Sequence, residues 1–162
     1  MSQPIGVTSQ QQFVFEKEIR IEASPDTVFR FFTDPEKMKQ WKGVDAELDP
    51  KPGGTYRVTV LPVAIAVGEY VRVEPPTFVS FTWGWEGEGQ PVPPGSSLVE
   101  VTLRPDGDAT VLMLRHTGLP SEEMATQHEQ GWTHYLGRLQ IAAAGGDPGP
   151  DPNLADGGQR RG

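Results

Sequence analysis

Six short runs of residues between Val44 and Thr117 alternate apolar and polar side chains, and this alternation constrains the fold more than any other feature. A repeat at every second residue is the pattern of a strand with one buried face. Clusters of proline, glycine and aspartate separate the runs and predict turns. Because these turns are short, neighbouring strands are expected to pair antiparallel. The expected strands are Val44–Leu48, Thr55–Leu61, Val67–Glu74, Phe78–Trp83, Leu98–Arg104 and Thr110–Thr117.

Two helix starts precede these strands. The sequences Ser24-Pro25-Asp26 and Asp34-Pro35-Glu36 each place a capping oxygen before a proline and an acidic residue, which is typical of a helix N-terminus. They predict short helices over Pro25–Thr33 and Pro35–Lys42. A further strand, Phe13–Glu22, precedes them, because apolar residues recur there at every second position.

The last expected element is a long amphipathic helix over Ser121–Ala143. Its apolar and aromatic residues recur at steps of three and four, which places them on one face. They include Met124, His128, Gly131, Trp132, Tyr135 and Leu139. A strongly curved sheet cannot close tightly around such a helix, so a mostly apolar pocket is expected between the concave face and the helix. The fold class is α+β, a curved antiparallel sheet of about seven strands around the C-terminal helix, with the two short helices between its first two strands.

One domain, residues 13–143, accounts for all these elements. Residues 1–12 are polar and rich in glutamine, and residues 144–162 are rich in glycine and proline. Segments of this composition bury too little apolar surface to offset the entropy of ordering. Both are therefore expected to be disordered tails. The segment Gly84–Ser96 is expected to be a long mobile loop between two strands.

The composition excludes several classes of function. A net charge of −8 argues against a surface for nucleic acid or for anionic membranes, which need clustered lysine and arginine. The chain has no cysteine, so thiol nucleophiles, disulfides and zinc–thiolate sites are excluded. No apolar run approaches the ~20 residues of a spanning helix, and the first residues lack a secretory signal pattern. We expect a cytoplasmic monomer or homodimer without membrane insertion, and neither a metal nor a cofactor.

Several stretches between Phe13 and Ala143, in unbroken order, carry a resemblance to a known family. They include Phe32-Thr33-Asp34-Pro35-Glu36-Lys37-Met38, Pro52-Gly53-Gly54-Thr55-Tyr56, Glu74-Pro75-Pro76, Phe81-Thr82-Trp83, His116-Thr117-Gly118-Leu119 and Gly131-Trp132. Together they resemble the START-like or SRPBCC superfamily, in particular its branch similar to the activator of heat-shock-protein-90 ATPase. The resemblance implies the helix-grip fold and, as in many superfamily members, a cavity for a hydrophobic small molecule. It implies no single activity, because members include lipid carriers, hormone receptors and polyketide aromatase/cyclase enzymes.

One departure from the family is visible at Trp41-Lys42, where the family often has paired tryptophans. Lys42 either places a charge at one mouth of the pocket or points to solvent. The resemblance also implies that the chaperone-activating role needs a separate N-terminal domain, and in so short a chain we expect no such domain and do not expect that role.

The inward faces of the strands and of the last helix supply the expected ligand-binding residues. Each aromatic member of the set either forms a cavity wall or packs in a solid core. His116 either contacts a ligand or bonds to nearby backbone, and His128 either forms a structural hydrogen bond or meets His116 across the cavity. The set is Phe32, Trp41, Tyr56, Val58, Phe81, Trp83, Leu112, Leu114, His116, His128, Trp132, Tyr135 and Leu136.

The leading hypothesis is non-covalent binding of a small hydrophobic or aromatic molecule in the cavity. A second is an enzyme of the polyketide cyclase or dehydratase kind, with His116 or Glu69 as the acid or base. Glu69 is also a candidate for an ion pair with Arg57 or Arg72, and the pattern leaves open whether Glu69 or Tyr70 faces inward. A third hypothesis is a protein-interaction module resembling the chaperone activators.

Overall fold

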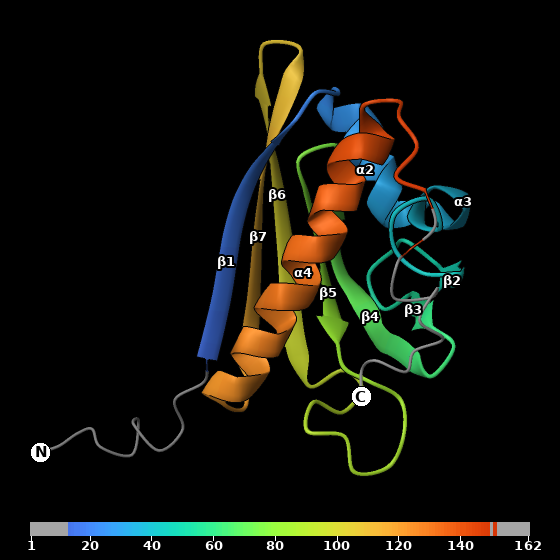
Figure 1. The fold of residues 1–162 in the computed structure, drawn as a ribbon, viewed down its shortest axis with the longest axis vertical. Helices are drawn as coiled ribbons and strands as arrows, with labels where there is room; N and C mark the ends of the chain where they lie inside the picture. Colours follow the sequence, from blue (N-terminus) through green and yellow to red (C-terminus); the bar gives the residue numbers. More distant parts are fainter. Residues whose placement is uncertain (1–12, 150, 152–162) are drawn as a thin grey trace, which may run out of the picture.

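Seven antiparallel strands form one sheet with the order β1-β7-β6-β5-β4-β3-β2. The long helix α4 crosses the face of this sheet (Figure 1), as seen in a computed structural model that describes residues 13–149 and 151. The expected fold class is confirmed. The helices are α2 (Pro25–Thr33), α3 (Pro35–Met38) and α4 (Glu122–Ala143). The strands are β1 (Phe13–Ile21), β2 (Asp45–Leu48), β3 (Thr55–Leu61), β4 (Ala64–Glu74), β5 (Phe78–Trp83), β6 (Ser97–Asp106) and β7 (Ala109–Leu119).

All three helices begin at the caps that the sequence predicts. The Ser24 hydroxyl accepts a hydrogen bond from the backbone N–H of Thr27. In the same way, the Asp34 carboxylate accepts from the backbone N–H of Glu36, and the Ser121 hydroxyl accepts from the backbone N–H of Met124. Each side chain thereby satisfies a helical N–H that has no partner within the helix. Helix α3 ends at Met38 and not at Lys42 as expected, and the chain continues through turns to Lys42.

The concave face of the sheet carries the core, as the alternation predicts. On β3, Tyr56, Val58 and Val60 are buried. On β4, Tyr70 is buried and donates from its hydroxyl to the Phe32 carbonyl at 2.7 Å, whereas Glu69 is exposed. The facing that the sequence pattern leaves open is therefore settled in favour of Tyr70.

Helix α4 packs closely against only one half of the sheet, the half that contains β1 and β7. It contacts β1, β7 and α2, and Figure 1 shows it slanting across the sheet, with β1 on one side and β5 and β4 on the other. Bulky side chains such as Trp83 and Trp132 fill the wider gap between the helix and β5. This asymmetry places the open space of the molecule on the β3–β5 side.

Two segments outside the regular elements also pack against the domain. In the loop between β5 and β6, Val92 is fully buried and accepts at its carbonyl from the Trp85 N–H at 2.7 Å. After α4, Asp151 is buried and accepts from the Tyr135 hydroxyl at 2.6 Å. Arg138 donates to the Gly149 carbonyl at 2.9 Å. The contacts of Gly149 and Asp151 differ from the disorder expected for the tail from residue 144 onward.

The expected tail at residues 1–12 lies outside the described residues, as do residues 150 and 152–162. Within the described part of the chain, no helix is long and apolar enough to cross a membrane.

Candidate ligand-binding site

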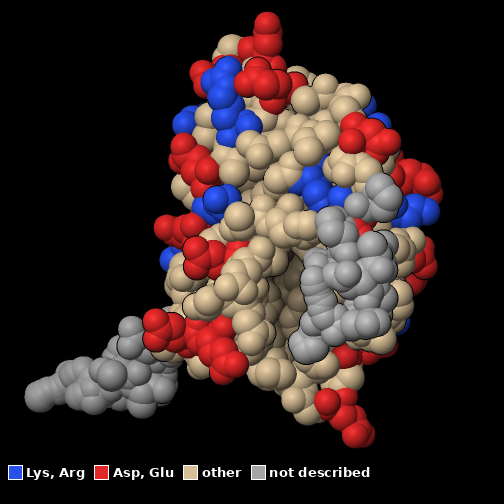
Figure 2. Space-filling model, in the orientation of Figure 1, with Lys and Arg blue, Asp and Glu red and all other residues tan. Residues whose placement is uncertain are grey.

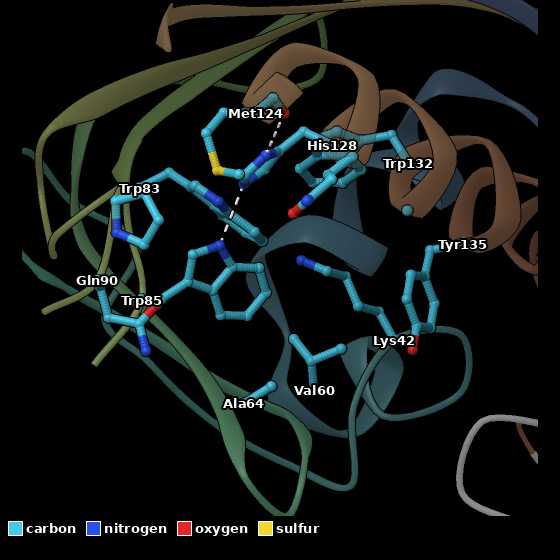
Figure 3. A pocket seen from close by; sticks show the side chains of 13 residues that line it. Lys42, Val60, Ala64, Trp83, Trp85, Gln90, Met124, His128, Trp132 and Tyr135 are labelled. Carbon is cyan, nitrogen blue, oxygen red and sulfur yellow. Dashed lines mark hydrogen bonds between the residues drawn. The ribbon is translucent and has the colours of Figure 1, made fainter. Parts of the chain in front are cut away.

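A cavity of about 270 Å³ lies between α4 and the β3–β5 side of the sheet. Its walls come from the loop after α3, the β3–β4 turn, β5 with the loop that follows it, and the first half of α4 (Figure 3). Figure 2 shows the surface hollowed beside α4 in this region. The lining residues are Lys42, Val60, Ala64, Trp83, Trp85, Gln90, Pro91, Met124, Gln127, His128, Gly131, Trp132 and Tyr135.

Four of the expected ligand-binding residues line this cavity: Trp83, His128, Trp132 and Tyr135. The others are buried but belong to the packed interior around it. Within that interior the Tyr56 and Phe81 rings stack at 4.1 Å between centroids, and Phe32 packs edge-on against Trp41. The residues away from the cavity are Phe32, Trp41, Tyr56, Val58, Phe81, Leu112, Leu114, His116 and Leu136.

His116 does not line the cavity, but it bonds to Trp132, a residue that does. Its Nδ1 accepts a hydrogen bond from the Trp132 indole at 3.1 Å. In a neutral ring the proton is then on Nε2, which lies 2.9 Å from the Ser97 hydroxyl. Ser97 donates in turn to the Trp83 carbonyl at 2.8 Å. With both ring nitrogens engaged, His116 orients Trp132 and has no nitrogen left for a ligand.

His128 plays the same part for a second tryptophan. Its Nδ1 lies 2.8 Å from the Met124 carbonyl, to which it donates, and its Nε2 accepts from the Trp85 indole at 3.1 Å. Figure 3 shows both bonds at the rim of the cavity. The rings of His128 and His116 meet edge to face at 5.1 Å between centroids.

Both histidines are held in the neutral form. Burial, with smaller contributions from the nearby His128 and Lys42, lowers the pKa of His116 to about 2. Burial also lowers the pKa of His128, against the opposing effect of its bond to the Met124 carbonyl. A base with so low a pKa is a poor proton acceptor near pH 7. The arrangement therefore suits the positioning of indoles better than proton transfer.

Lys42 points into the cavity and not to solvent, with only 3% of its surface exposed. Its backbone N–H donates to the Met38 carbonyl at 2.9 Å. Arg138 on α4 holds the preceding carbonyl, that of Trp41, at 3.0 Å. Gly43 follows with a φ of +94°, a conformation that only glycine adopts readily. The loop is thereby fixed against α4 with the side chain turned inward.

The Lys42 ammonium group is surrounded by aromatic faces. Nζ lies 3.9 Å from the centroid of the Trp83 ring and 4.5 Å from that of Trp132. Each such contact favours a charged amine by about 0.5–2 kcal/mol. Burying an isolated charge costs more, several kcal/mol in proteins. Burial therefore lowers the pKa of Lys42 well below its usual value.

The expected catalytic alternatives are not supported by the geometry. Glu69 is exposed on the sheet and lies outside the cavity lining. The arginines expected to pair with it have other partners, since Arg57 pairs with Glu86 and Arg72 with Glu74. Among the described residues, no group of three metal-ligating side chains is assembled.

Sequence reasoning missed five of the residues that line the cavity. The sequence pattern assigns Trp85 to the loop after β5, yet this residue continues the period of two beyond Trp83 and forms a bridge to Ala66. That spacing is a usable signal for a wall residue. The remaining missed residues lie at the start of β4, in the loop after β5 and on the polar face of α4, where no periodicity points inward. They are Ala64, Gln90, Pro91 and Gln127. Val60 lines the cavity from the face of β3 that the alternation predicts to be inward.

Comparison with known proteins agrees with this architecture. Residues 22–144 match the family described as activator of Hsp90 ATPase homolog 1-like protein. The solution structure of an AHSA1-like protein from Rhizobium etli is 48% identical, covers 88% of each chain and has a TM-score of 0.70. None of the curated proteins compared with the chain matches it significantly.

Two further structures extend the comparison. DynU16, a protein of the dynemicin biosynthetic locus, is 28% identical over 83% of this chain and 48% of its own, with a TM-score of 0.71. An HSP90 activator from Plasmodium falciparum shares the fold, with 22% identity over 80% of this chain and 94% of its own and a TM-score of 0.66. The family match covers most of the described domain, and the chain belongs to the family of activator of Hsp90 ATPase homolog 1-like proteins.

Proposed function

We propose that the protein binds a small hydrophobic or aromatic molecule non-covalently in the cavity between α4 and the sheet. The observation that carries this proposal is the cavity itself, walled by the indoles of Trp83, Trp85 and Trp132. Two of these indoles are held in place by histidines, so the walls are organised before any ligand arrives. Preorganised walls reduce the ordering cost of binding.

The size of the cavity limits the ligand. A volume of about 270 Å³ lies just below the roughly 300–1,000 Å³ of most ligand pockets. A molecule of one or two rings is therefore favoured over a long polycyclic one. A ligand that buries roughly 200 Å² of apolar surface gains about 5 kcal/mol. That gain corresponds to a Kd of roughly 0.1–1 mM before any polar contact.

A cyclase- or dehydratase-like enzyme has weaker support. The relative from a biosynthetic locus makes a small-molecule substrate a reasonable alternative. However, both nitrogens of His116 are bonded within the protein, and Glu69 is exposed. Neither candidate group is available in the cavity as an acid or base.

A chaperone-activator-like interaction module is the remaining alternative, and the family name favours it. Under this alternative, the amount of partner protein captured in a pull-down depends on exposed side chains and does not change when the cavity is altered. Variants that fill the cavity therefore separate the two proposals.

The test uses a matched pair of glycines on α4. A Cβ added at Gly131, which lines the cavity, or at Gly137, which does not, meets nothing within 4 Å. Both positions therefore accept a side chain, and glycine is a poor helix former. Gly131→Leu should fill the cavity while the helix gains stability. Gly137→Leu is the control with the same change of residue.

Binding is followed by ¹⁵N NMR during titration with 2-methylnaphthalene. The indole N–H signals of Trp83, Trp85 and Trp132 should shift and saturate, whereas that of Trp41, bonded to the Phe31 carbonyl, should not. Gly131→Leu should weaken binding at least tenfold and Gly137→Leu should leave it unchanged. Equal binding in the two variants, or no saturable shift of the cavity indoles, contradicts the proposal.

A further inference from the structure

Two residues that line the cavity, Lys42 and Trp83, each carry a buried nitrogen atom without a hydrogen-bond partner among the described residues. These atoms are Nζ of Lys42 and Nε1 of Trp83. Both side chains are at least 97% buried, with exposures of 3% and 2%. The two side chains are in contact, since Nζ lies 3.9 Å from the centroid of the Trp83 ring.

A buried donor without a partner is expensive. Leaving one unsatisfied costs about 1–3 kcal/mol, and more when the group is charged. Buried polar groups in native proteins nearly always have a partner. Two such donors on side chains that contact each other therefore mark a place where an acceptor is missing among the described residues.

The charge around the cavity specifies the acceptor further. Among the described lining residues, Lys42 is the one charged side chain, and there is no carboxylate. The other titratable groups near it are His116 on β7 and His128 on α4, both neutral, and Tyr135, whose hydroxyl donates to Asp151. No acidic group in the described part of the chain offsets the burial of the Lys42 amine. A cationic ligand is disfavoured, and a wholly apolar one leaves both donors unsatisfied.

We propose that the cavity is built for an aromatic carboxylate, whose ring lies against the indoles and whose carboxylate accepts hydrogen bonds from Lys42 Nζ and Trp83 Nε1. This inference rests on the proposed function and adds the polar half of the ligand. A charge-assisted hydrogen bond is about twice as strong as a neutral one. It also supplies the counter-charge that the buried amine lacks within the protein.

The test uses probes of matched shape: 2-naphthoate, its neutral amide 2-naphthamide, and 2-methylnaphthalene. Their Kd values are measured for the wild-type protein, for Lys42→Met and for Lys39→Met. Lys42→Met removes the amine and leaves an unbranched apolar side chain only one atom shorter, so the cavity is retained. Lys39 pairs with Glu36 outside the cavity, and its variant controls for the loss of one positive charge.

Lys42→Met is expected to weaken 2-naphthoate at least tenfold relative to its effect on 2-methylnaphthalene, or about 1.4 kcal/mol of coupling. Lys39→Met should change this ratio less than twofold. In the wild-type protein 2-naphthoate should bind more tightly than 2-naphthamide, and in Lys42→Met this order should reverse. A ratio unaffected by Lys42→Met overturns the inference, even when 2-methylnaphthalene still binds. If none of the three probes binds, the proposed function fails as well.

The Trp83 indole provides a second readout that a loss of folding does not imitate. Its N–H proton should move downfield on binding of 2-naphthoate, because it gains an acceptor, and much less with 2-methylnaphthalene. The N–H groups of Trp85 and Trp132 already have histidine acceptors, so their signals report only the contact with the ring of the probe and should shift by similar amounts in both titrations. Equal shifts of Trp83 with the two probes contradict its role as a donor.

Discussion

The neighbouring residues Trp41 and Lys42 belong to two different parts of the protein interior, here called the packed end and the cavity end. The packed end is the tightly filled part beside α2, and the cavity end is the part that borders the cavity. Trp41 lies in the packed end below α2, where its indole donates to the Phe31 carbonyl at 3.0 Å and its ring meets Phe32. Lys42 lies in the cavity end, where its amine has aromatic faces around it and no acceptor among the described residues. Both side chains are almost wholly buried.

The two parts of the interior differ in how their polar atoms are satisfied. In the packed end, the polar atoms of Trp41 and Tyr70 donate to backbone carbonyls of α2. In the cavity end, histidines accept from two indoles, whereas Lys42 Nζ and Trp83 Nε1 have no partner among the described residues. Satisfied groups contribute to stability on folding, whereas each unsatisfied buried donor costs about 1–3 kcal/mol.

The largest expected contrast is between Trp41→Ala and Trp85→Ala. Removing Trp41 from the packed end should lower the free energy of unfolding by about 3–5 kcal/mol, as for other buried aromatic residues. Trp85 is only partly buried and borders open space, so its removal should lower that free energy by less than about 1.5 kcal/mol. Urea unfolding of both variants measures the difference, and equal losses would mean that the two ends are packed alike.

A smaller effect is expected from the neutral state of His116. Its pKa is about 2 in the folded protein and about 6.5 when unfolded. Between these values the unfolded chain binds the extra proton, so stability falls as the pH decreases from 6.5 toward 2. The loss is about 1.4 kcal/mol per pH unit. His116→Gln should remove that part of the slope between pH 6.5 and 4.5, and a slope identical to that of the wild-type protein would refute the assignment.

The smallest of the three stability effects is predicted for Lys42→Met. Removing a buried amine that lacks a hydrogen bond should raise the free energy of unfolding at pH 7 by about 1–3 kcal/mol. Because burial lowers the pKa of Lys42 below its value in the unfolded chain, wild-type stability should also rise with pH up to the unfolded pKa near 10.5.

Chemical unfolding of Lys42→Met at several pH values tests both parts. The variant should lack the rise of stability with pH, and Lys39→Met, with its ion pair at the surface, should keep it. A destabilised Lys42→Met protein would show that the two cation–π contacts outweigh the cost of burial.

The sequence predicts the fold well because turn residues and caps act locally. Strands β3 and β5 and helix α2 begin and end at the predicted residues, each bounded by glycine, proline or a capping side chain. Alternation also identifies the inward faces correctly, as Tyr56 and Val58 show. Alternation cannot decide which residues of β4 face inward, because a register shift between Tyr70 and Arg72 interrupts the period of two.

The candidate site is less predictable, because a pattern gives the direction of a side chain and not the distance to what it faces. Leu112 and Trp83 both point inward, yet one is enclosed in the core and the other borders a void. That outcome depends on how α4 tilts toward β1. The inward turn of Lys42 depends on Gly43 and on the Arg138 bond to the preceding carbonyl, a long-range contact without a sequence signature.

Gly131 leaves room in the middle of α4 where a larger side chain would fit without a clash at its Cβ. A helix interior favours almost any other residue over glycine, by roughly 0.5–1 kcal/mol. A search for heat-resistant variants of this protein is therefore expected to select substitutions at Gly131 early. The larger of those substitutions would stabilise the helix and occupy the cavity that Gly131 lines, so that, under the proposed function, selection for heat resistance would work against ligand binding.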